Sequence, residues 1–367
     1  MLFELDPTQF SRLRGLVQPL HHHLAVTAVL EDHASGRVWV DDPLAPQSAL
    51  LQIQHRFYLA GRADNPGWIS ALRGLFMDEL LPLGRQQGEV EFGLHYDGAE
   101  WEPAILAFLA EHEPIFSRRK YFEFQRLRDL AWRERIPEGM AIQPVDAQLL
   151  GGEALDHLDE LRSETTSETP ATAYFLENRF GFCLRNANAI AGWCLSEYNW
   201  AGRCEVGIET AAEYRRQGVG LLTASALVEH ALEQGIAQIG WDCWANNLAS
   251  ARTALKVGFE EKADYAAAFA WFDLPSNLAV HGSVSFEAGR LVEAREWFER
   301  AFQSGQPPLW AQVVAAFTCC RLGERAAALA HLRSALDGGF TGLDWIRTSE
   351  HLQDLHATRE WQDWLGG

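Results

Sequence analysis

The spacing of apolar and polar residues divides the chain into three segments. Residues 1–135 and 136–274 mix strand-like runs with helical ones, whereas residues 275–367 show helical spacing throughout. Proline-bearing stretches at 137–139 and 275–277 mark the boundaries between the segments. The pattern predicts a mixed α/β (α+β) protein of three domains, the last of them all-α.

The first segment predicts a sheet with helices. Pro66 begins a helix whose apolar residues keep helical spacing, and a second helix is expected near residues 102–110. Short apolar runs predict strands at 36–40, 49–53, 56–60, 89–94 and 120–124.

A glycine-bearing turn in the middle segment joins a strand to a helix. Cys204–Thr210 alternates as a strand does, and residues 219–234 carry apolar residues at helical spacing before Gly235 ends the helix. Gly218 and Gly220 have no Cβ to keep a ligand from the main chain. Free N–H groups and the helix dipole can therefore converge on an anion at this turn.

A second strand and helix follow in the same segment. Residues 239–244 predict a strand, and a short helix is expected to begin at Asn247 as its cap and to end at Gly258.

The C-terminal segment repeats itself with a period of 34 residues. Small and large apolar residues recur at matching places, as in tetratricopeptide-like helix pairs, which this segment resembles. The repeated positions are Gly289, Ala294, Phe298, Ala301 and Phe302, followed by Gly323, Ala328, Leu332, Ala335 and Leu336. A generic stack of helical hairpins is the alternative. Either arrangement predicts a packing or interaction element.

Composition and charge narrow the class of protein. The 367 residues are 47% hydrophobic and 22% charged, as in soluble globular proteins. Fifty acidic against 31 basic residues give a formal net charge of -19, which disfavours nucleic acid or an anionic membrane as a partner. Cationic small molecules fit this charge better.

The cysteines and the N-terminus predict a cytoplasmic protein. The six cysteines lie mostly inside apolar runs, without the spacing of a zinc site or a disulfide framework. The N-terminus lacks the pattern of a signal peptide, and no apolar run reaches the roughly 18 residues of a membrane span.

No metal site is expected. The triplet His21, His22 and His23 invites a metal interpretation, but consecutive residues of a helix or strand point in different directions and cannot all bind one ion.

Two motifs in the middle segment resemble those of the GNAT superfamily of acyl-CoA-dependent N-acetyltransferases. Its phosphate signature has Arg or Gln, two variable residues, Gly, one variable residue and then Gly or Ala, which Arg215, Gly218 and Gly220 match. Its second element is Asn followed eleven residues later by Gly-Phe, which Asn247 and Gly258-Phe259 match.

Further stretches, at 180–183, 205–210 and 241–243, resemble the subfamily that includes zwittermicin-resistance acetyltransferases. In that subfamily a reduced GNAT-like domain precedes the catalytic one. The resemblance implies such a domain at 1–135 and a catalytic domain at 136–274, with the helical tail outside it.

The resemblance implies an acetyl-CoA site. The pyrophosphate would lie on the N–H groups at the helix start, and the pantetheine arm would enter between two splayed strands. Asn247 would contribute to this cradle or serve only as the helix cap. The residues implied to bind acetyl-CoA are Ile208, Thr210, Arg215, Arg216, Gln217, Gly218, Val219, Gly220, Leu221, Asn247 and Ser250.

Glu205 and Glu209 are the candidate general bases. They share one parity in their strand, so either can face the cleft and remove the ammonium proton through water, unless both lie at a solvated strand edge. Backbone N–H groups near Ile208 would polarise the thioester carbonyl. Many relatives have a proton-donating tyrosine where this chain has Ala254, so Tyr265 or solvent would replace it.

The acceptor is expected to be a small amine. Residues 163–178 occupy the stretch where this fold builds its acceptor wall, and Glu164, Glu168 and Tyr174 belong to it. Acidic residues there would suit a cationic amine, or they belong to a mobile polar loop. The alternative function is a catalytically weak acyl-CoA-binding adaptor that engages a protein through the helical tail.

Overall fold

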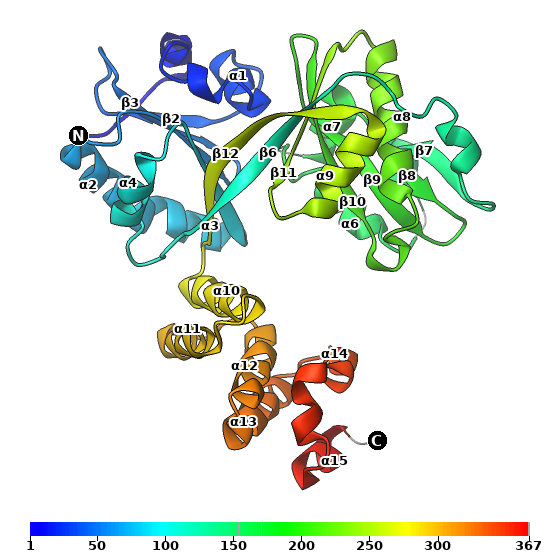
Figure 1. The fold of residues 1–367 in the computed structure, drawn as a ribbon. Coiled ribbons are helices and arrows are strands. Elements are labelled where there is room, and N and C mark those ends of the chain that lie inside the picture. The colour runs from blue at the N-terminus through cyan, green and yellow to red at the C-terminus, as the bar shows by residue number, and fades with distance from the viewer. Residues whose placement is uncertain (153–154, 170, 366–367) are drawn as a thin grey trace. The chain divides into compact units, whose positions relative to one another are not determined.

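A computed structural model of the chain describes residues 1–152, 155–169 and 171–365. The chain forms two compact units, and each draws on several stretches of the sequence (Figure 1). The first unit consists of Met1–Trp68, Gly93–Glu102 and Phe116–Ala268, and the second of Ile69–Phe92, Pro103–Ile115 and Phe269–Gly367. The mixed α/β class and the helical C-terminal region are confirmed. The boundaries of the three expected domains stay a prediction.

One mixed sheet contains the twelve strands of the described residues. Antiparallel pairs join most neighbours, while β4–β5 and β10–β11 are parallel. The sheet belongs to the first unit except for the ends of β5, β6 and β12. The strands, in their order across the sheet, are β1 (Phe3–Glu4), β2 (Arg37–Val40), β3 (Ser48–Ile53), β4 (Arg56–Gly61), β5 (Glu91–Tyr96), β12 (Phe259–Trp271), β6 (Ile115–Phe124), β11 (Gln238–Trp244), β10 (Arg203–Thr210), β9 (Ile190–Trp200), β8 (Gly181–Arg185) and β7 (Ala141–Pro144).

The strands expected in the first segment are confirmed, with shifted ends. The largest shift is in β6, which begins at Ile115. The pattern does not predict β9, because Ile190–Leu195 is buried on both faces and therefore has no polar alternation.

Helix α8 (Val219–Glu233) is the longest helix of the first unit and is buried on two sides. Ala224, Leu227 and Val228 pack with β10, β11 and α9 (Leu248–Val257), whereas Leu222 and Ala226 pack near Trp132. This double burial explains its weak amphipathic pattern.

The remaining helices of the first unit are short. Three of them, α5, α6 and α7, share a second apolar cluster with β8 and β9. The short helices are η1 (Pro7–Leu13), η2 (Gln18–Leu20), α1 (Leu24–Leu30), η4 (Trp132–Arg135), α5 (Ala147–Leu150), α6 (Leu158–Glu164), α7 (Thr172–Asn178) and η5 (Ala212–Tyr214).

The second unit is helical. Two of its helices, α2 (Pro66–Leu75) and α4 (Trp101–Phe108), begin in the first unit, as the sequence predicts from Pro66. The others are η3 (Phe76–Leu80), α3 (Leu81–Gln87), α10 (Leu274–Glu287), α11 (Leu291–Ser304), α12 (Leu309–Arg321), α13 (Arg325–Asp337), α14 (Leu343–Thr348), η6 (Glu350–Leu355) and α15 (Arg359–Leu365).

The 34-residue period of the tail corresponds to two consecutive helix pairs. Helix α10 packs on α11, and α12 packs on α13. Gly289 and Gly323, 34 positions apart, hold a left-handed conformation in the two turns. The small residue Gly282 lets Phe298 approach, since a Cβ at residue 282 would lie 2.8 Å from the Phe298 ring. The tetratricopeptide-like class of these pairs stays a prediction.

Among the residues that the structure describes, no helix combines the length and apolar character that crossing a membrane requires.

Gly258 joins α9 to β12 through a close backbone contact. Its φ is +129°, and its carbonyl accepts the N–H of Gln125 at 3.1 Å. A Cβ at this position would lie 1.8 Å from the Arg126 carbonyl oxygen. Glycine is therefore required here by packing.

Replacing Gly258 with alanine should destabilise the protein by about 3 kcal/mol, because the added Cβ would force residues 126 and 258 apart. Gly202→Ala is the matched control: Gly202 also has a positive φ, but a Cβ there meets no atom within 4 Å, so only the backbone cost of about 1–2 kcal/mol applies. Urea unfolding followed by tryptophan fluorescence measures both. Equal losses in the two variants would contradict this account of Gly258.

Candidate active site

Strands β10 and β11 separate after a short paired stretch. Their register pairs Arg203–Val206 with Gln238–Trp241, and no described residue extends it. Beyond it, β10 continues to Thr210 beside β9, and β11 continues to Trp244 beside β6. The facing edges of residues 207–210 and 242–244 are therefore open, as an inserted amide-rich ligand requires.

The glycine-bearing turn leaves the start of α8 without a side-chain cap. Gly218 is the N-cap residue with a φ of +85°, and its side-chain position is open, since a Cβ there meets nothing within 4 Å. Arg216 also has a left-handed conformation, with a φ of 64°. The first N–H groups of this fifteen-residue helix are thus available to an anion.

The turn lies against the open end of β10. A Cβ on Gly220 would lie 3.0 Å from the Ile208 side chain. The Nε of Arg215 donates to the Thr210 carbonyl at 3.2 Å, and its guanidinium lies 3.5 Å from the Glu209 carboxylate. The structure therefore brings the expected phosphate turn and the end of β10 together.

Asn247 and Ser250 both have structural roles at the start of α9. The Asn247 side chain accepts the N–H of Ser250 at 3.1 Å and so caps the helix. The Ser250 hydroxyl accepts from the indole of buried Trp241 at 2.9 Å. These bonds fix α9 against β11, beside the open edge.

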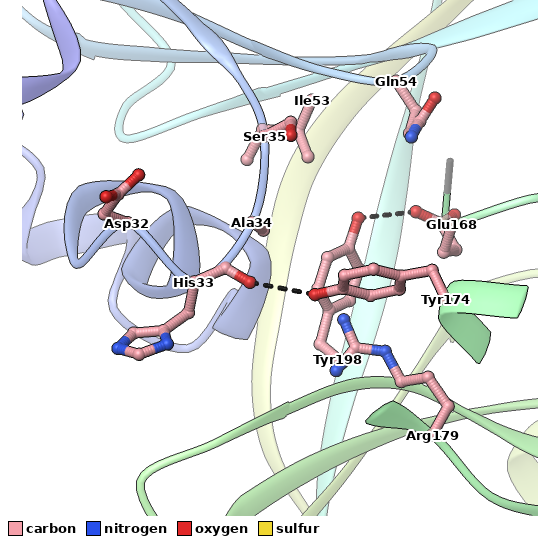
Figure 2. A pocket seen from close by; sticks show the side chains of 10 residues that line it. All are labelled: Asp32, His33, Ala34, Ser35, Ile53, Gln54, Glu168, Tyr174, Arg179 and Tyr198. Atoms are coloured by element: carbon pink, nitrogen blue, oxygen red, sulfur yellow. Dashed lines mark hydrogen bonds between the residues drawn. The ribbon is translucent and has the colours of Figure 1, made fainter. Parts of the chain in front are cut away.

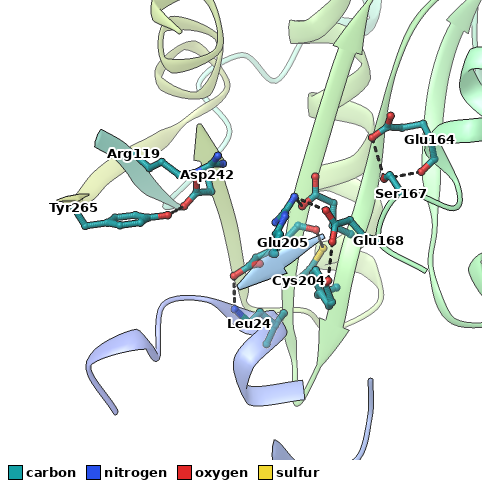
Figure 3. A network of polar contacts seen from close by, with 12 residues as sticks. Leu24, Arg119, Glu164, Ser167, Glu168, Cys204, Glu205, Asp242 and Tyr265 are labelled. Carbon is teal, nitrogen blue, oxygen red and sulfur yellow. Dashed lines mark hydrogen bonds and ion pairs between the residues drawn. The ribbon is translucent and has the colours of Figure 1, made fainter. Parts of the chain in front are cut away.

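Glu205 is buried beside the opening. It is 9% exposed, and its carboxylate accepts the N–H of Leu24 at 2.5 Å (Figure 3). Burial raises the pKa of Glu205 to about 8, the Leu24 hydrogen bond opposes the shift, and nearby Glu197 adds to it. The group therefore changes charge near neutral pH.

Glu209 has a different environment from Glu205. It is exposed at the end of β10, next to Arg215. The parity argument places both carboxylates on one face, but only Glu205 is desolvated.

Arg56 contacts two further carboxylates on the same face of the sheet as Glu205. Its guanidinium forms an ion pair with buried Glu168 and lies 3.7 Å from Glu197. The Tyr198 hydroxyl donates to Glu168 at 2.7 Å (Figure 2). Burial raises the pKa of Glu197 to about 7, although Arg56 opposes the shift.

A bulge in β9 places Glu197 in this network. Tyr198 pairs with Glu205, and the next pair joins Ser196 to Val206, so Glu197 is the extra residue. Bulges redirect side chains next to functional sites. This one adds a carboxylate beside Gly207, where the open edge begins.

On the other side of the opening, Asp242 of β11 is held by two partners. Arg119 of β6 forms an ion pair with it, and the Tyr265 hydroxyl of β12 donates to it (Figure 3). Burial raises the pKa of Tyr265 well above its ordinary value. Ala254, where relatives have a tyrosine, is fully buried in α9.

The consecutive histidines form an aromatic cluster. The rings of His22 and His23 lie 4.1 Å apart, and His95 lies 4.7 Å from His23. Burial lowers the pKa of His22 to about 4 and keeps that of His23 well below its ordinary range. Within the described ranges, no group of three or more His, Cys, Asp or Glu side chains is arranged to hold a metal ion.

Sequence reasoning missed Arg56, Arg119, Glu197 and Asp242 as site residues. Arg56 directly precedes the apolar run Phe57–Ala60, and a charge next to such a run is the one available signal. These four residues come together through the order of the strands in the sheet, which cannot be read from the sequence.

Known proteins are similar to most of this chain. A family model described as GNAT acetyltransferase matches residues 16–268. An uncharacterized N-acetyltransferase of Bacillus subtilis strain 168, YdfB, is 23% identical over 267 residues, which cover 72% of this chain and 97% of that protein. The helical tail lies outside the residues that the family model matches.

One solved structure shows the same fold over nearly all of its length. A GCN5-related N-acetyltransferase-like protein from Streptococcus suis 89/1591 superposes with a TM-score of 0.56 at 20% identity, covering 72% of this chain and 98% of that chain. A GCN5-related N-acetyltransferase from Sphaerobacter thermophilus gives a TM-score of 0.48 at 15% identity, and the match covers 74% of this chain and 95% of that chain.

The shifted pKa of Glu205 predicts how stability depends on pH. Because the folded pKa is about 8 and the ordinary value is 4.5, the folded state binds the proton more tightly than the unfolded chain. The unfolding free energy of the wild type should therefore fall as pH rises through this window. Glu205→Gln cannot ionise, so its stability relative to wild type should rise by a few kcal/mol from pH 5 to 9.

Urea unfolding at several pH values measures this difference. Glu209→Gln is the control, because Glu209 is exposed, and its curve should run parallel to that of the wild type. If the curve of Glu205→Gln runs parallel to that of the wild type, burial does not raise the pKa of the Glu205 carboxyl.

Proposed function

Because the chain belongs to the GNAT acetyltransferase family, we propose that it transfers an acetyl group from acetyl-CoA to the primary amine of a small molecule. The observation that carries the proposal is the open edge of β10, which lies between the uncapped start of α8 and buried Glu205. The catalytically silent adaptor gains no support from the comparisons. The six cysteines are free and buried, which fits a reducing cytoplasm.

The turn at Gly218 and the open edge of β10 would each bind a different part of acetyl-CoA. The pyrophosphate would bind the N–H groups of Arg216–Leu221, with charge from Arg215 or Arg216. The pantetheine amides would bond to the main chain of Ile208 and Thr210, as a missing strand would. Asn247 and Ser250 would border this groove while keeping their structural bonds.

Glu205 would act as the general base. An ammonium proton passes to Glu205 through water, and the neutral nitrogen then attacks the thioester carbonyl carbon. N–H groups near Ile208 would stabilise the oxyanion. The carbon–sulfur bond breaks, the nitrogen releases its second proton to solvent, the thiolate takes one up from solvent, and Glu205 returns its proton to solvent before the next cycle.

The leaving thiolate needs little help. Ala254 supplies no proton, and the Tyr265 hydroxyl is already bonded to Asp242. A thiol with a pKa of about 8.5 departs as a thiolate near neutral pH. Solvent is therefore the proton source that we propose.

Gly218→Glu should abolish acetyl-CoA binding, because a carboxylate would occupy the pyrophosphate site. Gly235→Glu is the matched control: Gly235 follows the other end of α8, has a φ of +77°, and also has open space around its Cβ position. Calorimetry with acetyl-CoA measures both variants. Unchanged affinity in Gly218→Glu, or equal loss in both, would overturn the phosphate assignment.

Glu205→Gln should lower kcat by about 10²- to 10⁴-fold, the usual contribution of a general base. Because the base acts when deprotonated, the wild-type kcat should rise about tenfold per pH unit up to pH 8 and then level off. Thiol release with a panel of amines measures both effects.

Glu209→Gln tests the second candidate base in the same assay. A smaller loss is expected, because Glu209 is exposed and lies beside Arg215. If neither glutamine variant slows transfer, the general-base assignment is wrong.

A further inference from the structure

A cavity of about 350 Å³ lies in the first unit, one strand away from Glu205 (Figure 2). Its lining comes from residues 32–35 after α1, the end of β3 and the turn after it, Glu168, helix α7 with Arg179 just after it, and strand β9. The side chains that matter here are Ser35, Gln54, Glu168, Tyr174, Arg179 and Tyr198. Glu168 and Tyr174 come from the stretch 163–178, which was expected to form an acceptor wall.

The negative charge of Glu168 in the stretch 163–178 is already neutralised. Glu168 is the buried carboxylate of the cavity, and Arg56 and the Tyr198 hydroxyl both bind it. A ligand ammonium would therefore have to compete with Arg56 for this carboxylate. The expectation that acidic residues here attract a cationic amine does not hold for Glu168.

Arg179 is the cation of the cavity without a carboxylate partner. No ion pair joins it to any carboxylate in the described ranges, and its Nε is buried without a hydrogen-bond partner. The guanidinium lies 5.7 Å from the centre of the Tyr174 ring and 5.4 Å from that of Tyr198 (Figure 2). Among the described residues its one hydrogen bond is a long contact, 3.4 Å, to the Asn199 carbonyl. A half-buried guanidinium whose Nε has no partner gains from an anion that joins it.

Tyr198 lies between the cavity and the proposed reaction site. This residue lines the cavity and pairs directly with Glu205 across β9 and β10. Neighbouring strands lie about 4.8 Å apart, so a ligand with one end at Glu205 and the other at Arg179 must be several bonds long.

We propose that Arg179 binds a carboxylate of the acceptor, so that the acceptor is an amine with a carboxylate several bonds from the reacting nitrogen. This inference rests on the proposed acetyl transfer for the position of the amine. Ser35 and Gln54 add uncharged hydrogen-bonding groups to the same cavity.

The charges of the cavity select a carboxylate over a phosphate. Arg179 contributes one unpaired positive charge, whereas Asp32 contributes a negative one, and Glu168 is neutralised by Arg56. These charges sum to zero before a ligand binds, so a monoanion leaves a smaller excess of negative charge in the cavity than a phosphate dianion does. A planar carboxylate also matches the guanidinium in shape.

Calorimetry with the full chain tests the proposal without requiring turnover. The probes are the ω-amino acids from 4-aminobutanoate to 8-aminooctanoate, each compared with the alkylamine of the same length. The wild type should bind the preferred amino acid about 10- to 100-fold more tightly than its alkylamine. Arg179→Gln should remove this preference and leave alkylamine binding unchanged.

Arg62→Gln is the control variant, because Arg62 is exposed and lies outside the cavity. Its affinities should equal those of the wild type. Equal binding of amino acids and alkylamines by the wild type, or a preference that persists in Arg179→Gln, would overturn the inference.

Acetyl transfer to the same probes separates this inference from the proposed function. Carboxylate binding that depends on Arg179, without acetylation of any probe, would support the subsite and count against the proposed transferase. Acetylation of amino acids and alkylamines at equal rates, with neither rate changed by Arg179→Gln, would support the transferase and overturn the subsite.

Discussion

The separation of β10 from β11 is the constraint on which the site depends. Parallel strands normally bond along their whole length, and here four residue pairs are followed by two diverging edges. Each strand stays in the sheet because β9 and β6 hold its other edge. Beyond Val206 this edge of β10 has no partner strand on the β11 side among the described residues, so an inserted ligand can take that place, although the Thr210 N–H already donates to Glu209 and the Thr210 carbonyl accepts from Arg215.

Several charged side chains lie close together on the face of the sheet beside this opening. Arg56 of β4 and Arg119 of β6 each form an ion pair with a carboxylate, whereas among the described residues no ion pair joins Glu205 to a cation. Burial penalises an unpaired carboxylate, so Glu205 keeps its proton to a higher pH than an exposed glutamate. A group with this behaviour is suited to exchange protons near neutrality.

The sequence predicts the local parts of this structure well. The turn at Gly218 and the cap at Asn247 are set by neighbouring residues, and the structure has both; Gly258 ends α9 as expected, while its packing against Arg126 is not local. The polar network around Arg56 cannot be predicted in this way, because it depends on segments that are distant in the sequence. Arg56 and Glu168 meet only because β4 and a distant loop converge, and Glu197 joins them through a bulge that no sequence pattern marks.

The order of the strands has a consequence for synthesis of the chain. Strand β6 lies between β11 and β12, and both of these are made more than a hundred residues after it. While the ribosome adds those residues, β6 has no neighbour on either side, and unpaired strand edges invite association between chains. The architecture that opens the groove therefore exposes the nascent protein to aggregation until its last strand is complete.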